Sequence, residues 1–99
     1  MIVYNVTVKI DNDVHEDWLH WMKTVHIPDV MQTGKFSENR MLKVLVNDTD
    51  GQTYSIQYSC DSMEVLDAYQ REDAPRLQAD HTQRYKDKFV AFRTLLQVV

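Results

Sequence analysis

The first ten residues alternate between apolar and polar side chains, and this pattern restricts the possible folds more than any other feature of the chain. The even positions carry the apolar set Ile2, Tyr4, Val6, Val8 and Ile10. The odd positions carry Val3, Asn5, Thr7 and Lys9. Successive side chains of a strand point to opposite faces, so residues 2–10 predict a strand with one apolar face. Other elements must then cover the sheet on that face alone.

A helical spacing follows this strand. One stripe of a helix is formed by Val14, Trp18, Trp21, Met22 and Val25. Residues 11–13 are all Asp or Asn, which commonly cap a helix N-terminus. We expect the helix to break at Ile27, because the residue before a proline is pushed away from the helical conformation. A short helical turn over residues 28–33 would then end at Gly34.

Residues 36–46 and 53–60 predict a hairpin whose turn is formed by residues 47–51. A second helix follows, because Asp61 and Glu64 have the spacing of a capping box. The inner stripe of that helix is marked by Met63, Leu66, Leu77 and His81. We expect Pro75 to kink this helix. The chain then closes with a last predicted strand over residues 89–99.

The predicted element order is therefore β-α-β-β-α-β, in a single domain over residues 1–99. Short right-handed connections leave very few topologies for this order, and the most economical is the ferredoxin-like sandwich. In this α+β fold a four-stranded antiparallel sheet carries both helices on one face. A chain of 99 residues has room for one such domain.

The uncovered face of this sheet is too polar for a core and more apolar than a free surface requires. Such a face suits an interface between two sheets in a homodimer. We place Asn5, Thr7, Gln57 and Arg93 on it. Two roles are open for Arg93: an ion pair across the dimer, which we favour, or an anion site inside the barrel.

Composition and charge limit the classes of partner. Eleven Lys and Arg against fifteen Asp and Glu give a formal net charge of -4, which does not favour nucleic acid. No apolar run suits a membrane span and no secretory pattern is seen, while the lone Cys60 cannot form an internal disulfide. We therefore expect a cytoplasmic protein. The four histidines lack metal-ligand spacing, so we expect neither a metal nor a cofactor.

Several segments together resemble a known family. They are the opening MIVYNVTVKI, the segment WLHWM with HIPDV and Gly34, the strand YSIQY, and the ending FRTLL. They are similar to an uncharacterised bacterial domain-of-unknown-function family of the dimeric α/β-barrel superfamily. The resemblance implies two ferredoxin-like subunits packed sheet to sheet. Characterised branches of the superfamily include antibiotic-biosynthesis monooxygenases, haem-degrading enzymes and muconolactone isomerases, so it implies no single reaction.

The haem-degrading branch offers a direct comparison. Its members typically use an Asn on the first strand, and a Trp and a His on the second helix. Asn5 and His81 fill two of these positions here. No Trp follows Trp21 in the sequence, and Asn5 alternates onto the uncovered face, away from the helices. The pattern therefore weighs against haem degradation.

The predicted topology brings one group of aromatic residues together. The two helices run antiparallel, which places His26 near Tyr69, while Tyr4 and Tyr58 rise from the sheet beneath them. Trp21 lies about one turn before His26. We interpret these five residues as lining a ligand pocket, with His26 as the candidate catalytic residue because it alone titrates near neutrality.

Two functions remain open at this stage. The first is binding of a small aromatic or apolar molecule, with cofactor-independent chemistry of the monooxygenase or isomerase kind. The second is a non-catalytic dimeric interaction module in which the same aromatic side chains only fill the core. An unfilled pocket would favour the first function, and tight packing would favour the second.

Overall fold

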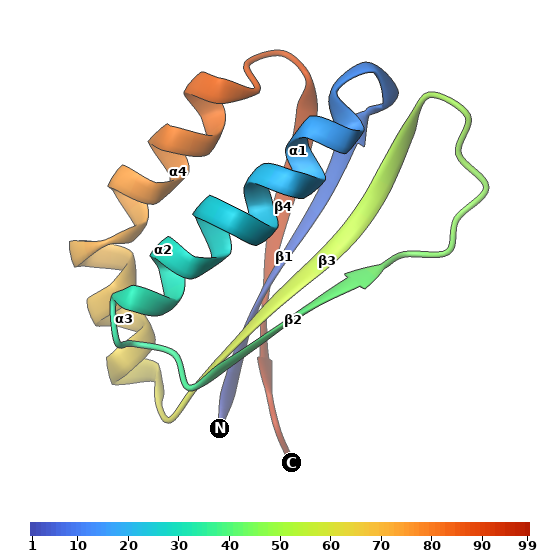
Figure 1. Ribbon diagram of the computed structural model, residues 1–99. Helices are drawn as coiled ribbons and strands as arrows, with labels where there is room; N and C mark the ends of the chain where they lie inside the picture. Colours follow the sequence, from blue (N-terminus) through green and yellow to red (C-terminus); the bar gives the residue numbers. More distant parts are fainter.

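A four-stranded antiparallel sheet with all helices on one face forms the structure, a computed structural model that describes residues 1–99 (Figure 1). The strands lie in the order β2-β3-β1-β4. Their bounds are β1 Ile2–Asp11, β2 Glu38–Lys43, β3 Gly51–Cys60 and β4 Phe89–Gln97. The predicted ferredoxin-like α+β fold is confirmed.

Two helical rods cover the sheet and lie side by side in Figure 1. The first begins with a 3₁₀ turn, η1 (Asn12–Val14), and continues through α1 (His15–Trp21), a π-helical segment η2 (Met22–His26) and α2 (Ile27–Gln32). The second consists of α3 (Met63–Glu72) and α4 (Ala74–Arg84). No helix is both long enough and apolar enough to cross a lipid bilayer.

The predicted break at Pro28 was wrong. Ile27 keeps helical angles, φ -61° and ψ -45°, and its N–H donates to the carbonyl of Met22, five residues earlier. A proline lacks the N–H that an α-helix needs, and its ring crowds the carbonyl four residues before it. The wider π turn accommodates both effects, so the helix continues past Pro28 instead of ending.

The second rod begins one residue later than predicted. Its N-cap is Ser62, whose side chain accepts a hydrogen bond from the Val65 N–H, and not Asp61. The predicted bend near Pro75 is present, because α3 and α4 are separated at Asp73. Lys35, in the loop after α2, holds this junction with an ion pair of 3.0 Å from Nζ to Asp73 Oδ2.

Strand register decides which face Arg93 occupies. Val6 pairs with Arg93, and Thr7 pairs with Phe92. Paired residues share a face, so Arg93 lies with Val6 on the side that the helices cover. Its predicted placement on the uncovered face was wrong. Apolar residues occupy both alternating sets of residues 89–99, so the strand's own pattern could not fix its register.

The other residues predicted for the uncovered face lie on it, together with apolar residues of β4. Asn5 pairs with Gln57 and Thr7 with Ser55, all on this face. Strand β4 adds Val90, Phe92, Thr94 and Leu96 to it. On the covered face lies one buried apolar cluster, in which Trp18 and Leu66 are fully buried. The sheet therefore has one face covered by the helices and one uncovered, partly apolar face.

Candidate functional site

A pocket lies between the helices and the covered face of the sheet. Strands β1, β3 and β4 form its floor, η2 and α2 form one wall, and α3 and α4 form the other. It contains about 530 Å³ of atom-free space with its open mouth included, of which about 50 Å³ can hold the centre of a water molecule. Eleven of its sixteen lining residues are hydrophobic. The space that water can reach is therefore that of a few water molecules.

Four of the five predicted pocket residues line this space: Tyr4, His26, Tyr58 and Tyr69. The ring centroid of Tyr4 lies 5.8 Å from that of Tyr69 and 6.2 Å from that of Tyr58. Phe36 packs behind them, with its centroid 4.8 Å from Tyr69. The antiparallel rods thus bring the phenols and the imidazole to one cavity, as the topology predicts.

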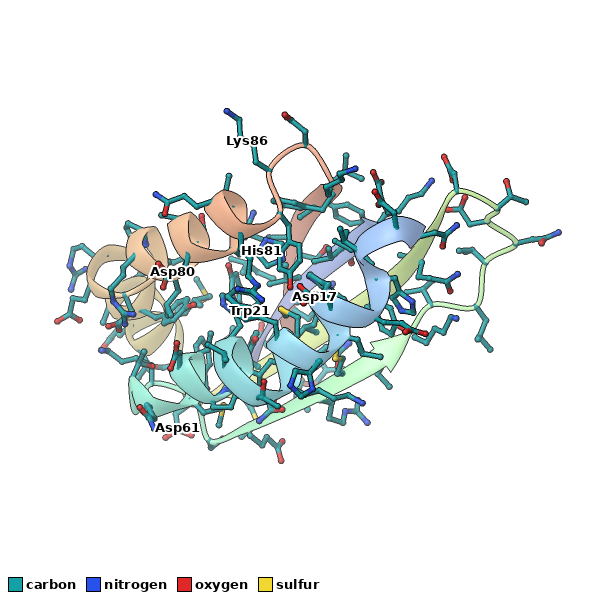
Figure 2. The ribbon with its side chains drawn as sticks, turned by 45° about the horizontal axis from the view of Figure 1, so that its top comes forward. Asp17, Trp21, Asp61, Asp80, His81 and Lys86 are labelled. Carbon is teal, nitrogen blue, oxygen red and sulfur yellow. The ribbon has the colours of Figure 1, made fainter.

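Trp21 does not line the pocket but forms its outer support. Its ring stacks on His26 at 5.0 Å between centroids and 27° between planes. It also lines an open hollow between the rods, where the Arg84 guanidinium lies 5.5 Å from the Trp21 ring. Figure 2 shows Trp21 and His81 facing each other between the rods, and their ring centroids are 5.8 Å apart.

His26 stands at the end of η2 with no protein hydrogen bond to either ring nitrogen. Burial lowers the pKa of its imidazole, and the carboxylates of Asp29 and Asp80 partly oppose this shift. The neutral form is therefore the main form at pH 7. A neutral imidazole offers one lone pair and one N–H, which suits it to accept or return a proton.

His81 is a pocket residue that the sequence pattern assigned only to the core stripe of its helix. Its Nε2 accepts a hydrogen bond of 2.9 Å from Trp18 Nε1. Burial lowers the pKa of His81 to about 4, and His26 and Arg93 contribute in the same direction. The ring is therefore neutral, with its proton on Nδ1 because Nε2 is an acceptor.

Arg93, an exposed residue, is another lining residue that was not predicted for this pocket. Its Nε donates to the Tyr4 hydroxyl oxygen at 3.0 Å, and no carboxylate lies within ion-pair distance of its guanidinium. The register of β4, and not the sequence pattern of that strand, brings Arg93 to the pocket.

No group of three His, Cys, Asp or Glu side chains is arranged to hold a metal ion.

Asn5 lies apart from this pocket, as its alternation predicted. Its Nδ2 donates to the Thr7 hydroxyl at 3.1 Å, and its Oδ1 accepts from the Ser55 hydroxyl, both on the uncovered face. His81 lies on the covered side. Within one chain, Asn5 and His81 therefore do not contribute to the same cavity.

The family described as domain of unknown function DUF4286 matches residues 1–99, the whole chain. The protein belongs to this family. The sequence resemblance to an uncharacterised domain-of-unknown-function family is thereby confirmed. A search of curated proteins found no significant match.

Solved structures share the fold at low sequence identity. A dimeric ferredoxin-like protein from an uncultured marine organism has a TM-score of 0.72 and 14% identity, over 100% of this chain and 95% of that one. A proposed antibiotic biosynthesis monooxygenase from Nitrosomonas europaea has a TM-score of 0.68 and 11% identity, over 100% and 99%. A point mutant of MhuD, with two manganese protoporphyrin IX molecules bound per active site, has a TM-score of 0.69 and 16% identity, over 100% and 95%. Identities this low establish the fold alone.

Proposed function

We propose that the protein binds a small, partly aromatic molecule between its helices and its sheet, and that His26 transfers a proton there. The observation that carries this proposal is the small pocket that His26 lines together with Tyr4, Tyr58 and Tyr69. Side chains that served only as core would close this space, since protein interiors pack nearly without voids.

The local backbone supports a functional role for His26. It is the last residue of η2, and π-helical turns occur frequently at functional sites. Its imidazole is neutral, has no protein partner and lines the pocket. These are the requirements of a general base.

Two cofactor-independent reactions fit such a base. In an isomerisation, His26 takes a proton from one ligand atom and returns it to another. In a monooxygenation, the ligand supplies two electrons and two hydrogens, and O₂ places one oxygen atom in the product and leaves the other as water. The fold shared with a proposed antibiotic biosynthesis monooxygenase supports the second reaction as a candidate.

The small volume of the pocket limits the ligand to a single ring at most. Only about 50 Å³ is available to the centre of a water molecule, which corresponds to a few waters. A porphyrin such as the one bound to MhuD contains four pyrrole rings, and this pocket would have to open widely to admit it. The geometry therefore does not favour haem.

We also propose that the protein forms a homodimer through the uncovered sheet face. Phe92 is 62% exposed and Val90 is 67% exposed on that face. Contiguous apolar side chains of this kind mark interaction surfaces. The similarity to a dimeric ferredoxin-like protein supports this assembly.

The same exposed face favours a second candidate function, an interaction module without a ligand. This candidate predicts that the pocket residues contribute to stability alone. The two functions therefore make different predictions, because only the first expects a ligand to bind beside His26.

The test is a thermal-shift screen of single-ring aromatic compounds on the wild type, His26→Ala and His20→Ala. A ligand that binds only the native state raises its melting temperature. We expect His26→Ala to abolish most of the ligand-induced shift, while His20→Ala, at an exposed position of α1, retains it. A screen without any shift, together with a lower melting temperature of unliganded His26→Ala, would favour the interaction module.

A further inference from the structure

The polar groups around the pocket can offer several hydrogen-bond donors to a ligand. Of the five N–H groups of Arg93, only the one on Nε has a partner, the Tyr4 oxygen. The planar edge formed by its two Nη atoms has no protein partner, and because Arg93 is exposed this edge is open to water and to a ligand. That edge matches the two oxygens of a carboxylate, which it can bind through two parallel hydrogen bonds.

The phenols add further donors. The Tyr4 oxygen already accepts from Arg93, so its O–H is left to donate. Tyr58 and Tyr69 line the pocket, and their hydroxyls are accessible to water there, because no fully buried side-chain oxygen lacks a hydrogen-bond partner. Burial raises the pKa of both phenols, so they remain protonated donors at neutral pH.

The charges of the pocket are not balanced. Arg93 is the only lining residue with a permanent charge, and no Asp or Glu lines the cavity. Asp29 and Asp80 face the open hollow outside it. Gln78 and Thr82 supply acceptor oxygens, but these carry no charge. The pocket therefore presents one solvent-exposed positive charge and several donors, which an anionic oxygen of a ligand would complement.

We propose that the ligand of this pocket is a single-ring aromatic carboxylate, held by Arg93 and the Tyr4 hydroxyl. This inference rests on the proposed function, because it assigns the chemical class of the same ligand. The carboxylate lies on the free edge of Arg93, and the ring lies among Tyr58, Tyr69 and the apolar lining. This arrangement leaves His26 free to act on the ring or its substituents.

The test compares acids with their neutral amides, which have nearly the same shape. Benzoate, cinnamate, benzamide and cinnamamide are titrated into the wild type, and dissociation constants are measured by ligand-observed NMR. We expect each acid to bind at least about tenfold more tightly than its amide, since a bidentate charged pair is strong. Arg93→Gln should remove this preference. Arg71→Gln, at an exposed position of α3 that makes no ion pair, should retain it.

A second variant tests the geometry if Arg93→Gln folds poorly. Tyr4→Phe keeps the ring and removes only the hydroxyl, and we expect it to reduce the preference for acids severalfold. Equal binding of acid and amide to the wild type, lost in His26→Ala, would overturn the carboxylate proposal and leave the proposed function standing. A pocket that binds neither acid nor amide would contradict both.

Discussion

At the scale of single residues, the buried imidazole of His81 links stability to pH. Its pKa is about 4 in the folded chain and near 6.5 when exposed. Between these values the unfolded chain binds a proton that the folded chain does not, so the free energy of unfolding falls as the pH is lowered. We expect a loss on the order of 3 kcal/mol from this residue, beginning near pH 6.5 and complete near pH 4. Urea unfolding at pH 7, 5.5 and 4 measures it.

The control is His81→Gln, whose amide does not titrate in this range and whose oxygen can accept from the Trp18 N–H. Its free energy of unfolding should fall less steeply between pH 6.5 and 4. The remaining slope includes His26, whose pKa is lowered in the same direction. Identical slopes in the wild type and in His81→Gln would refute the assignment.

Cys60 should act as a structural side chain. It is 1% exposed, it continues the apolar face of β3, and burial raises the pKa of its thiol. Cys60→Ala should therefore lower the free energy of unfolding by about 1 kcal/mol through lost packing. Urea unfolding measures this loss. Rapid reaction of the native thiol with a bulky disulfide reagent would contradict its burial.

The residues of the candidate site differ in how far the sequence could predict them. The positions of Tyr4 and Tyr58 in the pocket follow from the alternation along their strands. The positions of His26 and Tyr69 follow from the antiparallel arrangement of the two helical rods. His81 accepts a hydrogen bond from Trp18, 63 positions earlier, which no local pattern reveals. The position of Arg93 in the pocket depends on the register between β4 and β1, which the sequence of β4 alone does not determine.

At the scale of elements, alternation correctly predicted β1, because its two faces differ sharply in polarity. It failed for the face of β4, because both faces of that strand are largely apolar. The proline rule failed at Pro28 because a π turn, which depends on packing over the whole rod, offers an alternative to breaking the helix. Local signals thus predict elements better than they predict registers.

The π segment leads to a prediction for Pro28→Ala. Restoring the missing N–H should allow residues 22–32 to adopt a regular α-helix, since Ala also favours that conformation. This change would rotate His26 relative to the pocket. We expect the melting temperature to be kept or raised, while the ligand-induced thermal shift decreases. An unchanged ligand response, with π-type hydrogen bonding retained in an NMR structure, would show that packing alone holds the segment.

At the scale of the whole molecule, the uncovered sheet face should control assembly. Because Arg93 lies on the covered face, the residue to test is Phe92, and a charge there should oppose burial against a second sheet. Light scattering coupled to size exclusion should give about twice the chain mass for the wild type and about the chain mass for Phe92→Asp. Val25→Asp, 41% exposed on the first helical rod, is the matched control and should remain dimeric. A monomeric wild type at micromolar concentration would refute the dimer.

The central position of β1 also has a kinetic consequence. This strand comes first in the chain, yet its two neighbours come much later, since Ile2 pairs with Cys60 and with Gln97. Both pairings close long loops, and the entropy of closing them is lost before the sheet contacts compensate for it. Strand β1 therefore completes its pairing only when the last strand docks, which we expect to make folding slower than that of a helical bundle of the same length. Until β4 docks, one edge of β1 is open to any other extended chain.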